Sequence, residues 1–460
     1  MKELLMPLLG DASELVGICS AHARCHTTLS RVVFSAAAAG LLFGAGAGAQ
    51  TTPPSDESTP PRQGDAEPYS PTPLGKLSAG ESPTSTPSEL DDIYTPAEPT
   101  LDVPLFDSPL NTVLEWTTAL ERETGLRLGF AYTAIFQQAS GGPNRRRGAS
   151  GDFDIMGAWT LLGRGTSDTG TLVFSFEDRH RFGPIPASQL RNELGTLHPP
   201  TNGFNDRGWV VRDVYWLQRL LDDRVRFALG RGDVSDFVGS HGMQSLNNSF
   251  SNRALSANTT VPFPGHGMAL GVSIRPTDEF YASVGGMNGY GDTTINDMKY
   301  LDEGDFFTFG EFGFTPHIEG LGRGRYRVLL WHMDAREGRG LDLPSDRGFS
   351  IILDQQIGES LQVFARYGYA DEAVTNIRSS FETGLGVRGL LGSPDNMTGV
   401  AFAYTERKRG RGEEKVLESF HRWQLTRFTQ FSLGVQGIFD PINSDQDAIA
   451  VFTSRLRVAF

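Results

Sequence analysis

From Leu126 to the last residue, many segments of the chain alternate between apolar and polar side chains at every second position. Successive side chains of a β-strand point to opposite faces, so this period predicts strands with one apolar and one polar face. The segment FSLGVQGIF, for example, places Leu433 and Val435 opposite Ser432. The pattern continues to the C-terminus, where SRLRVAF ends on Phe460 on the apolar face.

The alternation predicts sixteen strands. Their expected starts lie near residues 125, 151, 169, 208, 223, 265, 278, 305, 323, 347, 360, 377, 397, 417, 430 and 448. Short turns such as 276–278 and 358–360 alternate with longer connections, notably 183–207, 232–264 and 289–304. An even number of antiparallel strands, with short turns at one rim and long loops at the other, is typical of an outer-membrane barrel.

The width of such a barrel decides which face is apolar. Sixteen strands enclose more space than side chains fill, so the interior holds water and the apolar face must contact lipid. Because lipid supplies no hydrogen bonds, the sheet must close on itself. The predicted fold class is therefore all-β, a 16-stranded antiparallel transmembrane β-barrel with a short N-terminal helix. Phe460, at the end of the last strand, resembles the terminal signal that the barrel assembly machinery reads, which makes that machinery an expected partner.

The chain divides into four predicted segments. They are a signal peptide region at 1–49, a Pro/Ser/Thr-rich disordered spacer at 50–105, an N-terminal helix at 106–124 and the outer-membrane β-barrel domain at 125–460. Arg24 and Arg31 flank an Ala- and Gly-rich apolar run that ends in small residues, as signal peptides do. For the helix, Ser108 is the expected cap, Pro109 suits the first turn and Gly125 suits the stop.

Composition argues against several classes of function. The formal net charge of −14 disfavours a nucleic-acid partner. Both cysteines, Cys19 and Cys25, precede the expected cleavage point, so the mature chain would have no disulfide, thiol nucleophile or cysteine metal site. The histidines of the barrel region show no metal-binding spacing, and no hydrolase or nucleotide-binding motif is present. We therefore expect no cofactor, no metal and no enzymatic activity.

Two stretches, 123–142 and 223–291, resemble the carbohydrate-selective porin family (OprB-like). In the second, a strand ending in Gly-Arg leads into a long loop with Asn248, Phe250 and Asn252, followed by a Pro-rich segment and a Gly-flanked strand. The chain departs from the family at Trp116, which is followed by two threonines where the family often has two glycines, and in its Pro-rich tract. The resemblance extends loosely over residues 107–460 and implies an outer-membrane sugar channel.

A sugar channel needs polar side chains that bind hydroxyl groups weakly. The alternation places Glu177, Arg179, Arg422 and Arg455 among the inward-facing charges. The loop from about 233 to 264 is expected to fold inward and form the constriction, as the resemblance implies. The candidate substrate-binding residues are Arg226, Asp236, Asn248, Asn252, Arg253, Asp354, Arg366, Glu382 and Arg388.

The favoured interpretation is passive, carbohydrate-selective diffusion of small sugars across the cell outer membrane. A general diffusion porin without sugar preference stays open as an alternative, as does an outer-membrane barrel enzyme. A structural or adhesive role for the Pro-rich tract is a third. The expected partners are small sugars, membrane lipid and the assembly machinery. Whether the chain forms a homo-oligomer, and which sugar it prefers, stay open.

Overall fold

The computed structural model describes residues 82–338, 341–409 and 412–460. Contacts divide the chain into two units, of which residues 68–103 and 107–460 make up the one that contains the barrel. The predicted signal peptide region at 1–49, and residues 50–81 of the predicted spacer, lie outside the described residues. Within the described part, no helix is both long and apolar enough to cross a bilayer.

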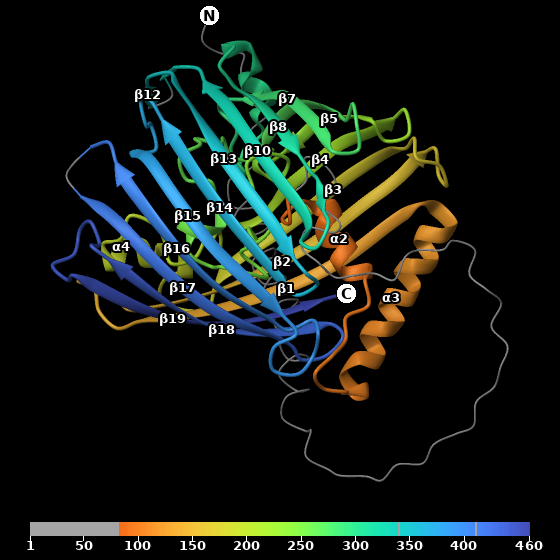
Figure 1. The fold of residues 1–460 in the computed structure, drawn as a ribbon, viewed down its shortest axis with the longest axis horizontal. Coiled ribbons are helices and arrows are strands. Elements are labelled where there is room, and N and C mark those ends of the chain that lie inside the picture. The colour runs from red at the N-terminus through yellow and green to blue at the C-terminus, as the bar shows by residue number, and fades with distance from the viewer. Residues whose placement is uncertain (1–81, 339–340, 410–411) are drawn as a thin grey trace, which may run out of the picture. The chain divides into compact units, whose positions relative to one another are not determined.

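Sixteen antiparallel strands form one closed sheet (Figure 1). They are β1 (Leu126–Ala139), β2 (Arg147–Leu162), β3 (Gly170–Arg181), β4 (Gly208–Leu220), β5 (Val225–Gly232), β6 (Gly267–Ile274), β7 (Phe280–Asn288), β8 (Phe306–Phe314), β10 (Gly322–Met333), β13 (Asp346–Ile357), β14 (Leu361–Ala370), β15 (Ile377–Arg388), β16 (Met397–Arg407), β17 (Glu413–Gln424), β18 (Thr429–Phe439) and β19 (Ala448–Ala459). Each strand pairs with its neighbours in sequence, and β1 pairs with both β2 and β19. The predicted fold class is confirmed.

The short elements lie between these strands. They are β9 (His317–Ile318) beside β10, the hairpin of β11 (Arg336–Gly338) and β12 (Leu341–Leu343), the helices α4 (Leu190–Leu194) and α5 (Arg253–Ser256), and the 3₁₀ turns η1 (Ala187–Gln189), η2 (Val234–Asp236) and η3 (Asp297–Glu303). The long connections 182–207, 233–266 and 289–305 leave one rim, and turns such as 221–224 and 358–360 lie at the other. This asymmetry agrees with the sequence pattern.

The two faces of the sheet carry different side chains. On the outer face, large apolar side chains are about half exposed, among them Val284 (56%), Phe312 (56%) and Phe452 (55%). Their neighbours in sequence point inward: Glu311 beside Phe312 is fully buried, and so is Val451 beside Phe452. A belt of exposed apolar side chains around a closed sheet fits contact with lipid rather than water.

The C-terminal residue closes the barrel. The amide of Phe460 donates to the carbonyl of Phe130 (2.9 Å), and the amide of Phe130 donates to the carbonyl of Phe460 (2.8 Å). The two rings stack with centroids 5.8 Å apart. Phe460 thus continues the pairing of β19 with β1, and its ring stacks on Phe130 at the seam.

The predicted N-terminal helix is longer than expected. Helix α3 runs from Pro104 to Thr124, so it begins before residue 106, and Pro109 lies inside it rather than at its start. Val103 occupies the cap position without a side-chain hydrogen bond, which corrects the role predicted for Ser108. A proline in the first position explains the earlier start, because its missing amide would have no helical acceptor there. Gly125 ends the helix in the left-handed conformation (φ 79°), as predicted.

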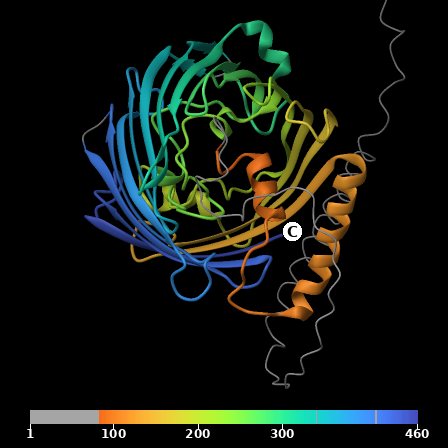
Figure 2. The same cartoon turned by 45° about the vertical axis from the view of Figure 1, so that its right-hand side comes forward.

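The predicted disordered spacer is wrong for part of its length. Helix α2 (Thr86–Tyr94) lies within residues 50–105 and buries Leu90 (0% exposed) and Ile93 (8%) against the inner wall of the barrel. Figure 2 shows α2 inside the ring of strands and α3 outside it. A Pro- and Ser-rich segment cannot form a core of its own, but here the barrel wall supplies the apolar partner.

Candidate functional site

The lumen is crossed by the loop of residues 233–266, which joins β5 to β6 and which we call the constriction loop (Figure 2). Its first half is held by β13 and β14. Asp354 accepts a hydrogen bond from the amide of Gly242 (2.7 Å), and Arg366 donates to the carbonyl of Gly239 (3.1 Å). Because the loop takes part through the amide of Gly242 and the carbonyl of Gly239, these wall side chains fix the path of the loop backbone.

Oppositely charged side chains of the wall form an ion pair where the wall contacts the constriction loop. Arg366 and Glu382, opposite each other on β14 and β15, form an ion pair in which each side chain is about 1% exposed. Arg366 also donates to Gln244 and to the carbonyl of Ala257 (2.5 Å) in the loop. Both terminal nitrogens of this guanidinium therefore hold the constriction loop, while its Nε donates to Glu382 (2.8 Å).

The second half of the constriction loop is held by β17–β19. Glu418 accepts hydrogen bonds from the amides of Ser251 (2.8 Å) and Asn252 (2.9 Å). The side chain of Asn252 donates to Gln436 (3.0 Å), and Arg455 donates to the carbonyl of Ser249 (2.8 Å). Both halves of the constriction loop are thus attached to the wall.

Aromatic rings pack the same loop against the wall. The ring of His241 stacks on Phe364 with centroids 3.9 Å apart, and its Nε2 lies 2.8 Å from the carbonyl oxygen of Leu255. Phe250 packs edge-on against Phe420 (5.0 Å). Burial, with Arg366 nearby, lowers the pKa of His241 well below its usual value, so this histidine is neutral and acts as a packing residue.

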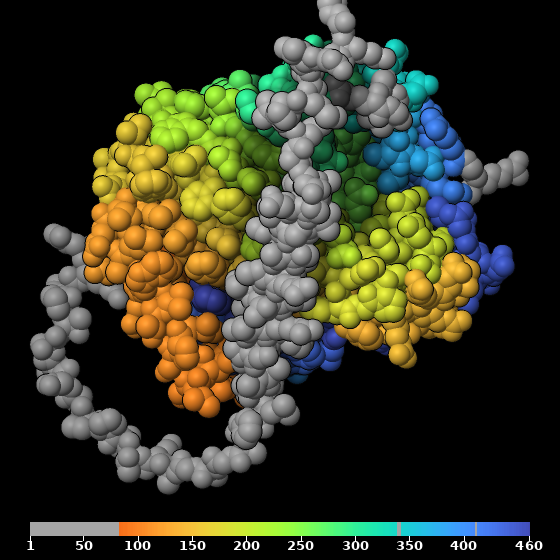
Figure 3. All heavy atoms as spheres, turned by 180° about the vertical axis from the view of Figure 1, so that it is seen from behind, coloured from red at the N-terminus to blue at the C-terminus, as the bar shows by residue number. Residues whose placement is uncertain are grey.

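A second inward loop, residues 182–207, joins β3 to β4. Glu414 accepts from the amides of Leu197 (2.5 Å) and His198 (3.0 Å), and Gln436 donates to the carbonyl of Pro200 (2.8 Å). The amide of Asn443 donates to the carbonyl of Gly195 (2.8 Å). In Figure 3, the yellow-green atoms of this part of the chain lie beside yellow-orange and blue atoms of the barrel. Two loops therefore narrow the lumen.

Helix α2 narrows the lumen further. Thr86 donates to Asp213 (2.8 Å) on β4, and Glu89 pairs with Arg457 (2.9 Å) on β19. Before the helix, Thr84 donates to Asp236 of the constriction loop (2.7 Å), which also pairs with Arg212 (2.7 Å). The segment is therefore attached both to the wall and to the constriction loop.

A polar cavity of about 170 Å³ remains between α2, the constriction loop and strands β15–β19. Its charged lining residues are the carboxylates Glu89, Asp91, Asp92 and Asp395 and the arginines Arg388, Arg422, Arg427 and Arg457. Ser245, Asn248, Gln424 and Gln430 add uncharged polar groups. One buried water needs about 10–15 Å³, so the cavity is large enough for a hydrated passage or a small polar solute.

The nine candidate residues fall into two groups and two single residues. Asn248 and Arg388 line the polar cavity. Those that anchor the constriction loop or the segment before α2 are Asp236, Asn252, Asp354, Arg366 and Glu382. Arg226 lies apart, near the rim with short turns, where it pairs with Asp223. Arg253 is exposed, and its amide donates to the carbonyl of Pro199 (3.1 Å). Solute binding by any of the nine stays a prediction.

Sequence reasoning missed the acidic side of the cavity. This side consists of Glu89, Asp91 and Asp92. They belong to the Pro/Ser/Thr-rich segment that was predicted to be disordered from its composition. One signal was available: TPSELDDIY has a serine cap at Ser85, and Leu90 and Ile93 are three residues apart, which is helical spacing. Arg427 and Arg457 were missed because one lies in a turn and the other ends a strand.

Three carboxylates of the wall, Asp152, Asp154 and Glu177, could share one metal ion, because oxygen atoms from all three lie within 4.8 Å of one another. Arginines already meet two of them: Arg179 pairs with Asp152 (3.0 Å) and with Glu177 (2.5 Å), and Arg207 also contacts Glu177. The group is better described as an ion-pair network than as a metal centre.

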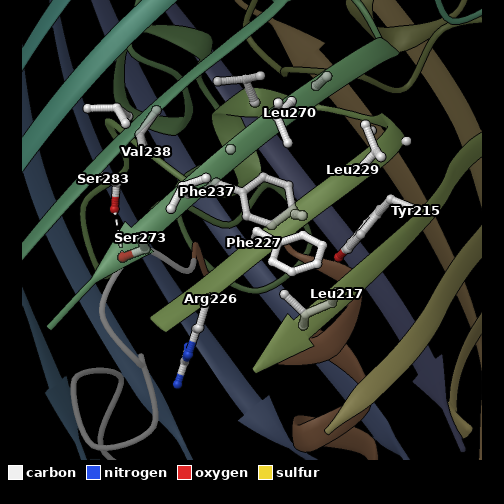
Figure 4. Close-up of a pocket in the computed structure, with 18 of the residues that line it drawn as sticks. Tyr215, Leu217, Arg226, Phe227, Leu229, Phe237, Val238, Leu270, Ser273 and Ser283 are labelled. Carbon is white, nitrogen blue, oxygen red and sulfur yellow. Dashed lines mark hydrogen bonds between the residues drawn. The ribbon is translucent and has the colours of Figure 1, made fainter. Parts of the chain in front are cut away.

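A separate apolar pocket lies beside strands β4–β7 (Figure 4). Tyr215, Leu217 and Phe237 contribute side chains, while Arg226 and the hydrogen-bonded pair Ser273 and Ser283 (2.9 Å) lie at its edge. Its apolar lining suits neither ions nor sugar hydroxyl groups, so we do not place it on the polar passage.

The chain is similar to proteins of known family. A model of the family described as "Carbohydrate-selective porin, OprB family" matches residues 160–460. Porin AaxA of Chlamydia felis is 23% identical over 272 residues, which cover 57% of this chain and 60% of that protein. Porin AaxA of Chlamydia abortus is 22% identical, covering 57% and 59%. The chain thus spans about three fifths of the length of these curated relatives.

Among solved structures, the high-pH structure of Pseudomonas putida OprB superimposes with a TM-score of 0.61 at 16% identity, over 75% of this chain and 96% of that one. This likeness concerns the fold. The family match covers well over half of the chain and includes β3–β19 together with both inward loops. The chain therefore belongs to the OprB family of carbohydrate-selective porins.

Proposed function

We propose that the chain is a passive channel of the outer membrane for small uncharged solutes rich in hydroxyl groups, such as monosaccharides. The observation that carries the proposal is the polar cavity inside a barrel whose outer face is apolar. A solute that cannot cross the apolar belt can cross where the wall offers hydrogen bonds. The family and the fold support a channel rather than an enzyme.

The chemistry of the cavity suits sugars. A sugar hydroxyl both donates and accepts, and the lining offers donors from arginines together with acceptors from carboxylates and amides. Gln430 and Asn248 add amide groups to the lining of the same cavity. Several weak sites of this kind let a solute bind and leave, which flux requires. Equal numbers of positive and negative charges leave no strong preference for an ion.

The test is permeation. Proteoliposomes should swell faster in glucose than in amino acids of similar size, and sugars added to a planar bilayer should reduce the single-channel current in a saturable way. Equal swelling rates would contradict sugar preference while leaving a general diffusion pore, and absence of any conductance would contradict the channel itself. Arg388→Ala should weaken the current block by sugars, with Arg347→Ala, an exposed arginine outside the cavity, as the matched control.

Two further proposals concern the membrane. Outer-membrane location is supported by the family and by the apolar belt. Recognition of Phe460 by the barrel assembly machinery is supported by its position at the end of the closing strand. Cell fractionation of the full chain tests the first. The folded yield of a Phe460→Ala variant in cells with and without depletion of that machinery tests the second.

A further inference from the structure

The polar cavity has one basic side and one acidic side, and the two come from different parts of the chain. The arginines belong to the barrel: Arg388, Arg422 and Arg457 lie on strands, and Arg427 lies in the turn before β18. Three of the four carboxylates, Glu89, Asp91 and Asp92, belong to α2. Formal charges therefore cancel only when the helix is in place.

Some of these charges are paired and others face the cavity. Glu89 pairs with Arg457 (2.9 Å), and Arg388 lies 4.0 Å from Asp395. Asp91 pairs with Arg127 of β1 (2.9 Å), which does not line the cavity. Asp92 is exposed to the cavity and faces the arginines of β15 and β17. Without α2, four arginines would face one carboxylate.

The barrel wall is shaped to hold this helix. Gly129 lies on β1 directly beneath α2, and a Cβ atom there would lie 2.8 Å from both Ile93 and Leu90. Leu90 and Ile93 pack with Ala131 and Met156 of the wall, and the hydroxyl of Tyr94 donates to the carbonyl of Leu128 (3.0 Å). A larger residue at position 129 would have to displace the side chains of Leu90 and Ile93.

We propose that α2 is the charge-selectivity element of the channel: its carboxylates neutralise the arginines of the wall and so let uncharged solutes pass without enrichment of anions. This inference rests on the proposed channel function. Arginine keeps its charge at any physiological pH, so an unbalanced set would concentrate anions in the cavity. Glu89, Arg422 and Arg457 are buried, and salt screens buried charges much less than exposed ones, so salt does not remove the effect.

The experiment is the reversal potential in planar bilayers with a tenfold KCl gradient, measured on the full chain. Wild type should show a potential near zero. The Asp91→Asn/Asp92→Asn variant removes two negative charges from the cavity lining. For each charge removed, the local concentration of anions should rise about threefold and that of cations should fall about threefold, taking a unit charge at roughly 6 Å in water. Glu98→Gln, an exposed carboxylate of the same segment that does not line the cavity, is the matched control and should behave as wild type.

Displacing the helix gives an independent arm. Gly129→Val should push α2 from the wall and produce the same shift toward anions, with higher conductance. Gly271→Ala, whose added Cβ atom would meet Phe309 at an ordinary 3.9 Å, controls for a glycine change in a strand. Conducting Asp91→Asn/Asp92→Asn channels with an unchanged reversal potential would overturn the inference and leave the channel standing. A wild-type chain that does not conduct would overturn the proposed function instead.

Discussion

The ion pair of Arg366 and Glu382 offers the sharpest test of how the constriction loop is held. Both side chains are about 1% exposed, and Arg366 contacts three acceptors of the loop besides Glu382. Glu382→Gln keeps an acceptor oxygen but leaves the guanidinium without a countercharge. Removing one partner of a buried pair costs roughly 3–5 kcal/mol, and we take the lower end because a hydrogen bond remains.

This loss appears as easier opening of the loop. A cost of about 3 kcal/mol multiplies the open population roughly 100-fold, because each 1.4 kcal/mol is a factor of ten. Arg253 is the single Lys or Arg in residues 233–266, so trypsin can cleave the constriction loop at one place. When opening is fast relative to cleavage, the cleavage rate follows the open population. We expect cleavage after Arg253 to accelerate about 100-fold in Glu382→Gln.

Two variants complete the test. Glu406→Gln removes an exposed glutamate of β16 bonded to Ser379 (2.9 Å) and should change the rate no more than about twofold. Arg366→Met/Glu382→Leu removes both charges and also the hydrogen bonds from Arg366 to the loop, so its loop should stay easy to cleave. Cleavage of Glu382→Gln at the wild-type rate would refute the anchoring role. Protection in the double variant would show that only charge burial matters.

The remaining predictions concern pH, lipid and the seam. Burial lowers the pKa of His198 to about 3, below its usual 6.5, so the fold favours the neutral ring. The stability contributed by this histidine is complete above pH 6.5 and falls toward pH 3, so loop 182–207 should lose about 2 kcal/mol at pH 5. Hydrogen exchange of that loop should show this loss in wild type and not in His198→Gln. An equal change of the exchange protection with pH in both proteins would contradict the role of His198. Val284→Arg on the outer face should destabilise the barrel by about 2–4 kcal/mol in urea titrations in lipid, against no change for Glu319→Arg in a rim turn. Phe460→Ala should lose the stack on Phe130, about 0.5–1.5 kcal/mol, and lower the folded yield in vesicles; an unchanged yield would exclude a role for the ring at the seam.

The barrel strands could be predicted because the two faces of each strand lie in different environments, one outside the barrel and one facing the lumen. Predicted starts at 208, 377, 397 and 448 coincide with those of β4, β15, β16 and β19, and the start predicted at 417 differs from Glu413 of β17 by only a few residues. One side carries exposed apolar side chains at every second position over much of the strand, as Val328 and Leu330 do on β10, so the apolar period is visible in the sequence. The short strands β9, β11 and β12 were missed because two or three residues carry no period.

The interior was less predictable. Alternation correctly placed Asp354, Arg366 and Glu382 on the inner face, but the same pattern arises whether a charge meets water, a solute or the carbonyls of a loop. The course of the constriction loop decides between these, and it depends on contacts over more than a hundred residues, such as Arg366 to Gly239. Helix α2 was missed for a related reason: its apolar partner is the wall, far away in sequence.

We infer that the apolar face of the barrel meets lipid while the polar face encloses an aqueous cavity. Single cysteines at Gln430, which lines the cavity, and at Leu433, on the outer face of the same strand, test it directly in a chain with Cys19 and Cys25 replaced by serine. In vesicles, Gln430→Cys should react with a membrane-impermeant thiol reagent. Leu433→Cys should resist that reagent, and a fluorophore attached there before reconstitution should be quenched by lipid-borne quenchers. Reaction of Leu433→Cys with the aqueous reagent, together with lipid quenching at position 430, would contradict this orientation of the sheet.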